Sequence, residues 1–455
     1  MSRQETQTTR EIALDLLLVR ERTRGDITEL LKDALAGAGA SLSVQEKAFL
    51  KRLTVGTVEK LLTIDAVIDH VASVKVKAMK PTVRNAIRLG SCQILYLDAV
   101  PDAAAVSESV AIVKKRGLTG LSGFTNAVLR RISKDRDKLL TYVSEAEPSV
   151  KYSMPPYLCG LFSQERGQEG MERIFSSLQE SRSVSIRPDP RLMRDQDRYA
   201  QWEDAFTQAV GNVRHHPLLR DLLLAEDTGD IRRLPGYAEG AFTVQDAASA
   251  LAVAACGIRE SDRVLDVCAA PGGKSLYAAA LLEDPSQLTA RDVSADKAAR
   301  IRENADRMRL SGIRTQEWDA TVFDEASREQ YDVVLCDLPC SGFGVMGRKP
   351  EIRYSASKGR TESLARLQRQ ILDTVWTYVK PGGILLYSTC TVSRAENEDN
   401  VRWFLENHPF EGESWIDSDL PGALRGRAEN GCLQILPGDY EETDGFFIAR
   451  LRRVE

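Results

Sequence analysis

The chain of 455 residues is too long for one typical domain, and with 43% hydrophobic and 28% charged residues it has a globular composition. No run approaches the roughly 18 apolar residues of a membrane span, and the amino terminus lacks a signal-peptide layout, so a cytoplasmic protein without a membrane partner is expected. The net charge of −5 is unevenly divided: residues 1–140 carry 23 Lys and Arg against 16 Asp and Glu, and the remainder carries 38 against 50. The basic first third favours nucleic-acid contact at that end.

The eight cysteines include no CxxC pair, and there are only four histidines. This pattern argues against a zinc ribbon, a disulfide framework and a metal site.

Residues 1–140 are predicted to form an all-helical domain. Apolar residues recur every three to four positions, Ser41 or Ser43 is placed to cap a helix, and Pro81 and Pro101 open two more. The order RNAIRLGSCQILYLDAVPDAAAVSESVAIVKK, followed by SGFTNAVLRRI, resembles the NusB-like RNA-binding domain. The resemblance implies binding to RNA or to a partner protein, and a purely structural module is the alternative.

Residues 141–235 are predicted to form a small α+β subdomain, because helical patterns give way to strand and turn patterns such as SVSIRPDPRLMRDQ. From residue 236 to 455 strands alternate with helices, which indicates a parallel sheet covered on both faces. GFFIARLRR at the end of the chain is predicted to be an edge strand of that sheet.

The strand RVLDV is followed by CAAPGGKS and then by a helix, an arrangement that places free helix N–H groups beside the sheet edge. The loop matches neither GxGxxG nor a Walker sequence, and a merely structural turn is the alternative. Asp266, Asp292 and Asp319 end three successive strands, and Asp292 lies at the offset expected for a ribose-binding acid. This ordering is similar to the S-adenosylmethionine-dependent methyltransferase fold.

Two cysteines end the next two strands, in YDVVLCDLPCSGFGV and GGILLYSTCTVSRAENE. Adjacent strands would bring Cys340 and Cys390 to the same sheet edge, while alternation points Cys336 into the sheet with Val334. A small buried hydrophobe is the ordinary role of a single cysteine. A pair suits cytosine methylation, because a thiolate added to C6 makes C5 nucleophilic and a second group must help to release the product. Asp337 is placed to hydrogen-bond N3 or the exocyclic amine of the base.

The motifs DVCAAPGGKS, DLPCSGFGV, YSTCTVSRAENE and GAFTVQDAAS resemble the NOL1/NOP2/Sun family of RNA cytosine-5 methyltransferases, and the NusB-like domain points to the Sun (RsmB-type) enzymes of 16S ribosomal RNA. The resemblance implies an α/β Rossmann-like catalytic domain, S-adenosylmethionine as cofactor, Cys390 as nucleophile and Cys340 in product release. It also implies that Lys274 and Asp337 lie in the active site, and that Phe446 and Phe447 pack near the target base or simply form a buried strand. The cofactor-binding residues that it implies are Cys268, Ala269, Ala270, Pro271, Gly272, Gly273, Lys274, Asp292, Asp319 and Asp337.

The chain departs from the family at two places that bear on the site. Arg187-Pro-Asp189 replaces the usual Arg-x-Asn, which puts the RNA contacts of the subdomain in doubt, and Ser294 replaces a second acid after Asp292. Two other functions compete: methylation of tRNA cytosine, and a non-catalytic NusB-like RNA-binding factor. The expected partner is structured RNA, with 16S rRNA first, and a monomer is expected.

Overall fold

The computed structural model describes residues 7–180, 183–413, 421–424 and 426–454. Its contacts divide the chain into two compact units, one of residues 1–175 with 348–356, the other of residues 176–347 with 357–455. The predicted division into three domains, with boundaries near 140 and 235, stays a prediction. Among the described residues, no helix combines the length and the apolar character needed to span a bilayer.

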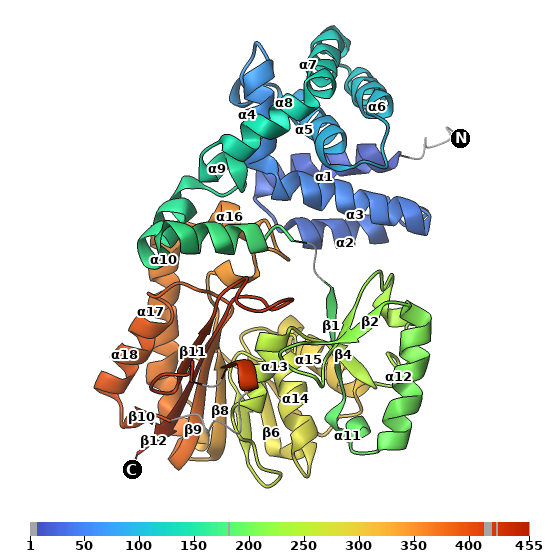
Figure 1. Cartoon of the computed structure of the whole chain (residues 1–455). Helices are drawn as coiled ribbons and strands as arrows, with labels where there is room; N and C mark the ends of the chain where they lie inside the picture. The colour runs from blue at the N-terminus through green and yellow to red at the C-terminus, as the bar shows by residue number, and fades with distance from the viewer. Residues whose placement is uncertain (1–6, 181–182, 414–420, 425, 455) are drawn as a thin grey trace. The chain divides into compact units, whose positions relative to one another are not determined.

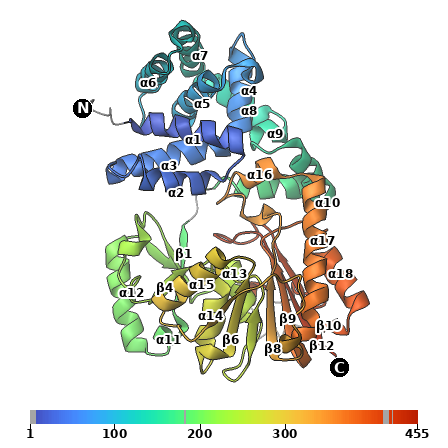
Figure 2. The same cartoon turned by 180° about the vertical axis from the view of Figure 1, so that it is seen from behind.

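The first unit is built of helices around one apolar core (Figures 1 and 2). Ser43 caps the third helix in a reciprocal pair with Glu46, as one of the two predicted caps. Its helices are α1 (Thr9–Thr23), α2 (Ile27–Ala36), α3 (Val44–Glu59), α4 (Leu61–Val71), α5 (Pro81–Tyr96), α6 (Asp102–Lys115), α7 (Ser122–Lys134), α8 (Arg136–Glu145), α9 (Pro148–Lys151), most of α10 (Pro156–Ser177) and α16 (Ile352–Ser355).

Residues 348–356 belong to this helical unit although they follow the loop that carries Cys340. Arg353 is completely buried, and its guanidinium donates to the carbonyl oxygens of Glu59 at 3.2 Å and Ser153 at 3.4 Å. The hydroxyl of Tyr354 donates to the carbonyl of Val58 at 2.7 Å. The segment is therefore fastened to the helical core by groups that need these backbone acceptors.

The second unit begins with a small antiparallel sheet in the order β2-β3-β1-β4. Its strands are β1 (Val184–Pro188), β2 (Val213–His215), β3 (Leu223–Ala225) and β4 (Phe242–Val244). Helix α12 (Gln196–Val210) packs Trp202 and Phe206 against Phe242 of this sheet, at ring-centroid distances of 5.9 and 5.3 Å. The short helix α11 (Pro190–Met193) connects β1 to α12.

The main sheet has eight strands in the order β10-β12-β9-β8-β5-β6-β7, with β11 paired to β12. The strands β5 to β9 are parallel, and β5 lies between β6 and β8, which makes it the point where the strand order reverses. The strands are β5 (Val264–Asp266), β6 (Leu288–Asp292), β7 (Arg314–Glu317), β8 (Tyr331–Asp337), β9 (Val379–Thr389), β10 (Phe410–Gly412), β11 (Cys432–Ile435) and β12 (Phe446–Arg453).

Helices cover both faces of this sheet, and each face has its own apolar core. One face carries α13 (Ala247–Ala254), α14 (Gly273–Leu281) and α15 (Ala295–Arg307); the other carries α17 (Lys358–Val375) and α18 (Glu398–Asn407). Cys336 is fully buried beside Val334 in the second core, which confirms the predicted orientation.

The predicted edge position of the last strand is wrong. Strand β12 pairs antiparallel with β9 on one side and with β10 and β11 on the other. The short strands β10 and β11 cover that side of β12, and their sequences have too weak a strand pattern for the two strands to be predicted.

Candidate active site

A glycine turn joins β5 to α14 and carries the predicted cofactor loop. Gly272 has a φ of 111°, a backbone conformation that favours glycine, and α14 starts at the next residue. The first N–H groups of α14 therefore face the carboxyl edge of the sheet, where doubly wound folds bind ligands.

Asp292 at the end of β6 holds this loop in place. Its Oδ2 accepts a hydrogen bond of 2.9 Å from the backbone of Ala270, and its Oδ1 lies 3.0 Å from the ammonium of Lys297. Ser294, one of the departures from the family, caps α15 by accepting from the backbone of Lys297.

Asp319 follows β7 on the surface. Hydrogen bonds from the backbone and hydroxyl of Thr321 lower the pKa of this carboxyl. Its predicted contact with the cofactor stays a prediction.

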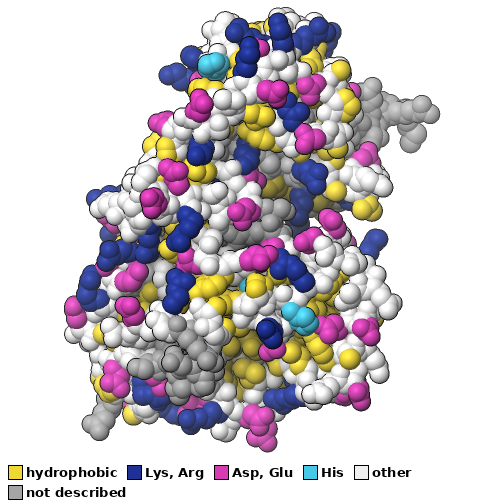
Figure 3. Space-filling view, in the orientation of Figure 1, with side chains coloured by type: hydrophobic (Ala, Val, Ile, Leu, Met, Phe, Trp, Pro, Cys, Tyr) yellow, Lys and Arg dark blue, Asp and Glu magenta, His cyan; other side chains and the backbone are white. Residues whose placement is uncertain are grey.

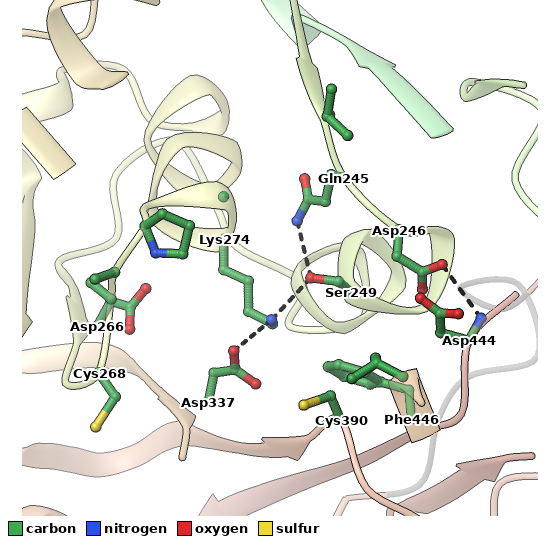
Figure 4. Close-up of a pocket in the computed structure, with 16 residues that line it drawn as sticks. Gln245, Asp246, Ser249, Asp266, Cys268, Lys274, Asp337, Cys390, Asp444 and Phe446 are labelled. Carbon is green, nitrogen blue, oxygen red and sulfur yellow. Dashed lines mark hydrogen bonds and ion pairs between the residues drawn. The ribbon is translucent and has the colours of Figure 1, made fainter. Parts of the chain in front are cut away.

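A cavity of about 280 Å³ opens at the carboxyl ends of β5, β8 and β9 (Figure 4). The predicted residues that line it are Cys268, Ala269, Ala270, Pro271, Gly273, Lys274, Asp337 and Cys390. Gly272, Asp292, Asp319 and Cys340 do not line it. One pocket thus joins most of the predicted cofactor loop to the predicted nucleophile.

Asp266 at the end of β5 presents an unused acceptor to this cavity. Its Oδ2 accepts from the hydroxyl of Ser275 at 2.6 Å, whereas the buried Oδ1 has no hydrogen bond among the described residues. Burial raises the pKa of Asp266 to about 7. An unpaired carboxylate oxygen beside a glycine turn fits the ammonium group of S-adenosylmethionine, which can only donate.

Lys274 of α14 forms an ion pair with Asp337 at the end of β8. Its Nζ donates to Asp337 Oδ2 at 2.7 Å and to Ser249 Oγ at 2.9 Å, and it lies 5.0 Å from the ring centre of Phe446. The hydroxyl of Ser388 donates to the other carboxylate oxygen at 2.9 Å. Burial alone would lower the pKa of Lys274, but the carboxylate of Asp337 outweighs it and the pKa is raised. The pair is therefore charged and fixed in place.

The two predicted catalytic thiols lie beside this pair. The sulfur atoms of Cys340 and Cys390 are 3.3 Å apart. The hydrogen bond with Cys390, followed by burial, raises the pKa of the Cys340 thiol well above its usual value. Either thiol can donate the hydrogen bond that joins the two sulfur atoms.

A buried carboxylate holds the loop that carries Cys340. Glu396, which is fully buried, accepts from the backbone of Ser341 at 2.8 Å and from the side chain of Gln368 at 3.1 Å. Gln368 also donates to the carbonyl of Pro339 at 2.8 Å. Through these contacts Glu396, in the segment SRAENE, orients the loop that carries Cys340.

The structure separates the two C-terminal aromatic residues. Phe446 lines the cavity, whereas Phe447 points to the opposite face of β12 and packs against Tyr387, with ring centres 6.1 Å apart. Only Phe446 is in position to contact a base in this cavity.

The structure brings to the site two residues to which sequence reasoning assigned no role, and a third, Arg187, that it had linked only to the RNA contacts of the subdomain. Gln245 and Ser249 lie in GAFTVQDAAS, which is recognisable as a family motif but carries no obvious chemistry. Arg187 is 3% exposed, stacks 4.3 Å from the ring centre of Tyr277 and donates to Gln245. Its burial removes it from any surface RNA contact.

Residues 253–452 match the family model described as 16S rRNA methyltransferase RsmB/F, and residues 7–134 match the NusB family. The probable ribosomal RNA small subunit methyltransferase B of Bacillus subtilis (strain 168) is 33% identical over 453 residues, which cover 98% of each chain. The chain belongs to the RsmB/F family of 16S rRNA methyltransferases. A second relative in this family, the probable ribosomal RNA small subunit methyltransferase B of Synechocystis sp. (strain ATCC 27184 / PCC 6803 / Kazusa), is 32% identical and covers 90% of this chain and 92% of its own.

Two solved structures share the fold of this chain over different lengths. The structure of PH0851 has a TM-score of 0.75 at 23% identity and covers 97% of this chain and 98% of its own. That of NSun6 from Pyrococcus horikoshii with SFG has a TM-score of 0.56 at 21% identity and covers 66% of this chain and 98% of its own.

Membership of the RsmB/F family confirms the predicted fold class, a NusB-like helical region followed by a Rossmann-like methyltransferase domain. It also confirms the predicted enzyme class, an rRNA methyltransferase, and its cofactor, S-adenosylmethionine.

Proposed function

We propose that this protein methylates C5 of a cytosine in 16S rRNA through a covalent bond between Cys390 and C6. The observation that carries the proposal is the 3.3 Å approach of two thiols at the ends of β8 and β9, beside the ion pair of Lys274 and Asp337. Two thiols at one sheet edge suit a reaction in which one thiol adds to the base and a second group assists its release.

The steps balance once the base that takes the C5 proton passes it to solvent. The Cys390 thiolate adds to C6, and the electrons of the C5–C6 double bond make C5 nucleophilic. C5 takes the methyl group from S-adenosylmethionine as the bond between that methyl and the sulfonium sulfur breaks, which leaves S-adenosylhomocysteine. A base of the cavity then removes the C5 proton, the double bond returns, and Cys390 leaves as a thiolate. Asp337 accepts a hydrogen bond from the exocyclic amine and positions the base.

The lining of the cavity supports the assignment of the two roles, because Cys390 lines it together with the cofactor loop and Cys340 does not. The thiol of Cys340, 3.3 Å from the sulfur of Cys390, can then donate a hydrogen bond to that sulfur as it leaves. This favours Cys390 for attack and Cys340 for release, rather than the reverse assignment.

The choice of 16S rRNA rests on the names of the family and the relatives and on the basic helical unit. Helix α7 carries exposed Arg130, Arg131 and Lys134, and dark-blue side chains crowd the top of Figure 3, where α7 lies in Figure 1. Positive charge of this kind binds phosphate without reading sequence, so tRNA remains the competing substrate.

The test is a denaturing gel of Cys340→Ser incubated with S-adenosylmethionine and either 16S rRNA or tRNA. We expect an RNA-linked band with 16S rRNA that disappears when Cys390 is also changed to alanine. An adduct with tRNA alone would move the substrate to tRNA. Binding of RNA without an adduct or 5-methylcytidine, by the wild type and by the variants, would support a non-catalytic factor.

A further inference from the structure

The hydroxyl of Ser249 lies between two groups that can only donate hydrogen bonds. It accepts from the ammonium of Lys274 at 2.9 Å and, in a longer contact of 3.4 Å, from the side-chain amide of Gln245 (Figure 4). An ammonium has no acceptor, and neither has the NH₂ group of an amide. The proton of Ser249 is therefore used by neither neighbour.

Arg187 decides which way the amide of Gln245 is turned. The guanidinium Nε of Arg187 donates to Gln245 Oε1 at 2.6 Å, and a guanidinium cannot accept. The oxygen of the amide must therefore face Arg187, and its NH₂ group must face Ser249. Both side chains are nearly inaccessible, 3% exposed for Arg187 and 5% for Gln245, so this orientation is fixed by burial.

The geometry leaves one direction for the Ser249 proton. The oxygen is bonded to its own carbon and accepts from two donors, so the remaining tetrahedral position holds the O–H. Among the described residues Ser249 donates no hydrogen bond, and it lines the cavity together with Cys390 and Asp337. The hydroxyl is a fixed donor that awaits an acceptor in the cavity.

We propose that Ser249 donates a hydrogen bond to N3 or O2 of the target pyrimidine, and that Gln245 and Arg187 are positioning residues that hold it in this direction. The inference rests on the proposed cytosine-5 reaction. Addition of the thiolate at C6 places negative charge on N3 and O2, so a donor that is already oriented stabilises the adduct more than the free base. Beside it, Asp337 offers an acceptor for the exocyclic amine, and an acceptor next to a donor matches cytosine.

The test measures single-turnover methyl transfer to 16S rRNA by the full chain. Ser249→Ala is expected to lower the rate about 10- to 100-fold, the range for loss of one preorganised donor when others remain. The affinity of Ser249→Ala for S-adenosylmethionine should be unchanged. Ser249→Thr, which keeps the hydroxyl, should retain most of the wild-type rate. Ser311→Ala, an exposed change, serves as the matched control.

A second variant tests the direction of the hydroxyl without removing it. Gln245→Glu still accepts from Arg187 but presents an oxygen to Ser249, which turns the serine proton away from the cavity. Gln245→Glu should lower the rate as much as Ser249→Ala does. The double variant should be little slower than either single variant, because both changes act through the proton of Ser249.

Three outcomes would overturn the inference: a wild-type rate for Ser249→Ala, a loss that appears in cofactor affinity instead, or fully additive effects of the two changes. A wild-type chain that makes no 5-methylcytidine in 16S rRNA or tRNA would instead refute the proposed function, since that control does not involve Ser249.

Discussion

Cys340 and Cys390 are 50 residues apart in the chain, yet their sulfur atoms lie 3.3 Å from each other. The cause is the parallel pairing of β8 with β9, in which Asp337 is opposite Ser388. Each cysteine follows shortly after its strand, so the sheet register itself delivers the two thiols to one place.

This closeness predicts sensitivity to thiol oxidation. A mild oxidant such as diamide, which takes up the two hydrogens, should join the sulfur atoms of Cys340 and Cys390 and abolish methylation. Dithiothreitol should restore the activity. Mass spectrometry of peptides after alkylation without reduction would identify the bond, and an active enzyme with both thiols alkylatable after treatment would contradict the prediction.

Lys274→Met should impair the reaction strongly. It leaves the carboxylate of Asp337 without its buried partner, and we expect methyl transfer to fall by about 10²- to 10³-fold. Lys380→Met is the matched control, because Lys380 forms a 2.7 Å ion pair with Asp332, which lies on β8 like Asp337 but away from the cavity. If both variants lowered the single-turnover rate of methyl transfer equally, Lys274 would act only by stabilising the fold.

The raised pKa of Asp266 predicts pH-dependent cofactor binding. In the free protein this carboxyl is protonated below about pH 7, and binding of an ammonium group favours the ionised form, so affinity should rise from about pH 5 to pH 7. Calorimetry should show that Asp266→Asn binds S-adenosylmethionine weakly and without this dependence. A wild-type affinity that is flat over the range would contradict a contact between Asp266 and the ammonium group.

The same shift has a consequence for stability. Because the folded pKa lies above the unfolded value, the contribution of protonated Asp266 is complete below about pH 4 and is lost as the pH rises through about 7. Asp266→Asn should therefore be more stable than the wild type above neutrality, as measured by chemical denaturation.

Arg353→Ala should loosen the helical unit. It removes the guanidinium that donates to the carbonyls of Glu59 and Ser153, and it leaves a cavity. The free energy of unfolding should therefore fall by on the order of 3 kcal/mol. Hydrogen exchange of peptides around these two residues should accelerate. Lys349→Ala, an exposed change in the same segment, should alter the free energy of unfolding by no more than about 0.5 kcal/mol.

The sequence predicts the outline of this protein well because its strongest patterns are local. The helical spacing of the first unit, the strand endings at Asp266 and Asp292 and the two cysteine loops depend on short stretches of chain. Strand β12 was misplaced because its neighbours β10 and β11 are only three and four residues long. Such short strands are defined by their pairing rather than by their own periodicity.

The support of the site was harder to predict for the same physical reason. The hydrogen bond between Arg187 and Gln245 joins positions 58 residues apart, and that between Ser249 and Lys274 joins positions 25 apart. Arg187 follows the strand pattern of an ordinary surface residue, and only the structure reveals its burial. Directed hydrogen bonds need coordinates, because a sequence does not show which acceptors remain unused.

The assignment of residues 348–356 to the helical unit means that the chain passes between the two units three times. A deletion of residues 1–175 would strip Arg353 and Tyr354 of the carbonyls that they bind, and would leave a buried charge exposed in the middle of the catalytic sequence. The helical unit is therefore no detachable appendage at the amino terminus. Domain shuffling could add or remove it only together with a matching change in the loop beyond the thiol motif.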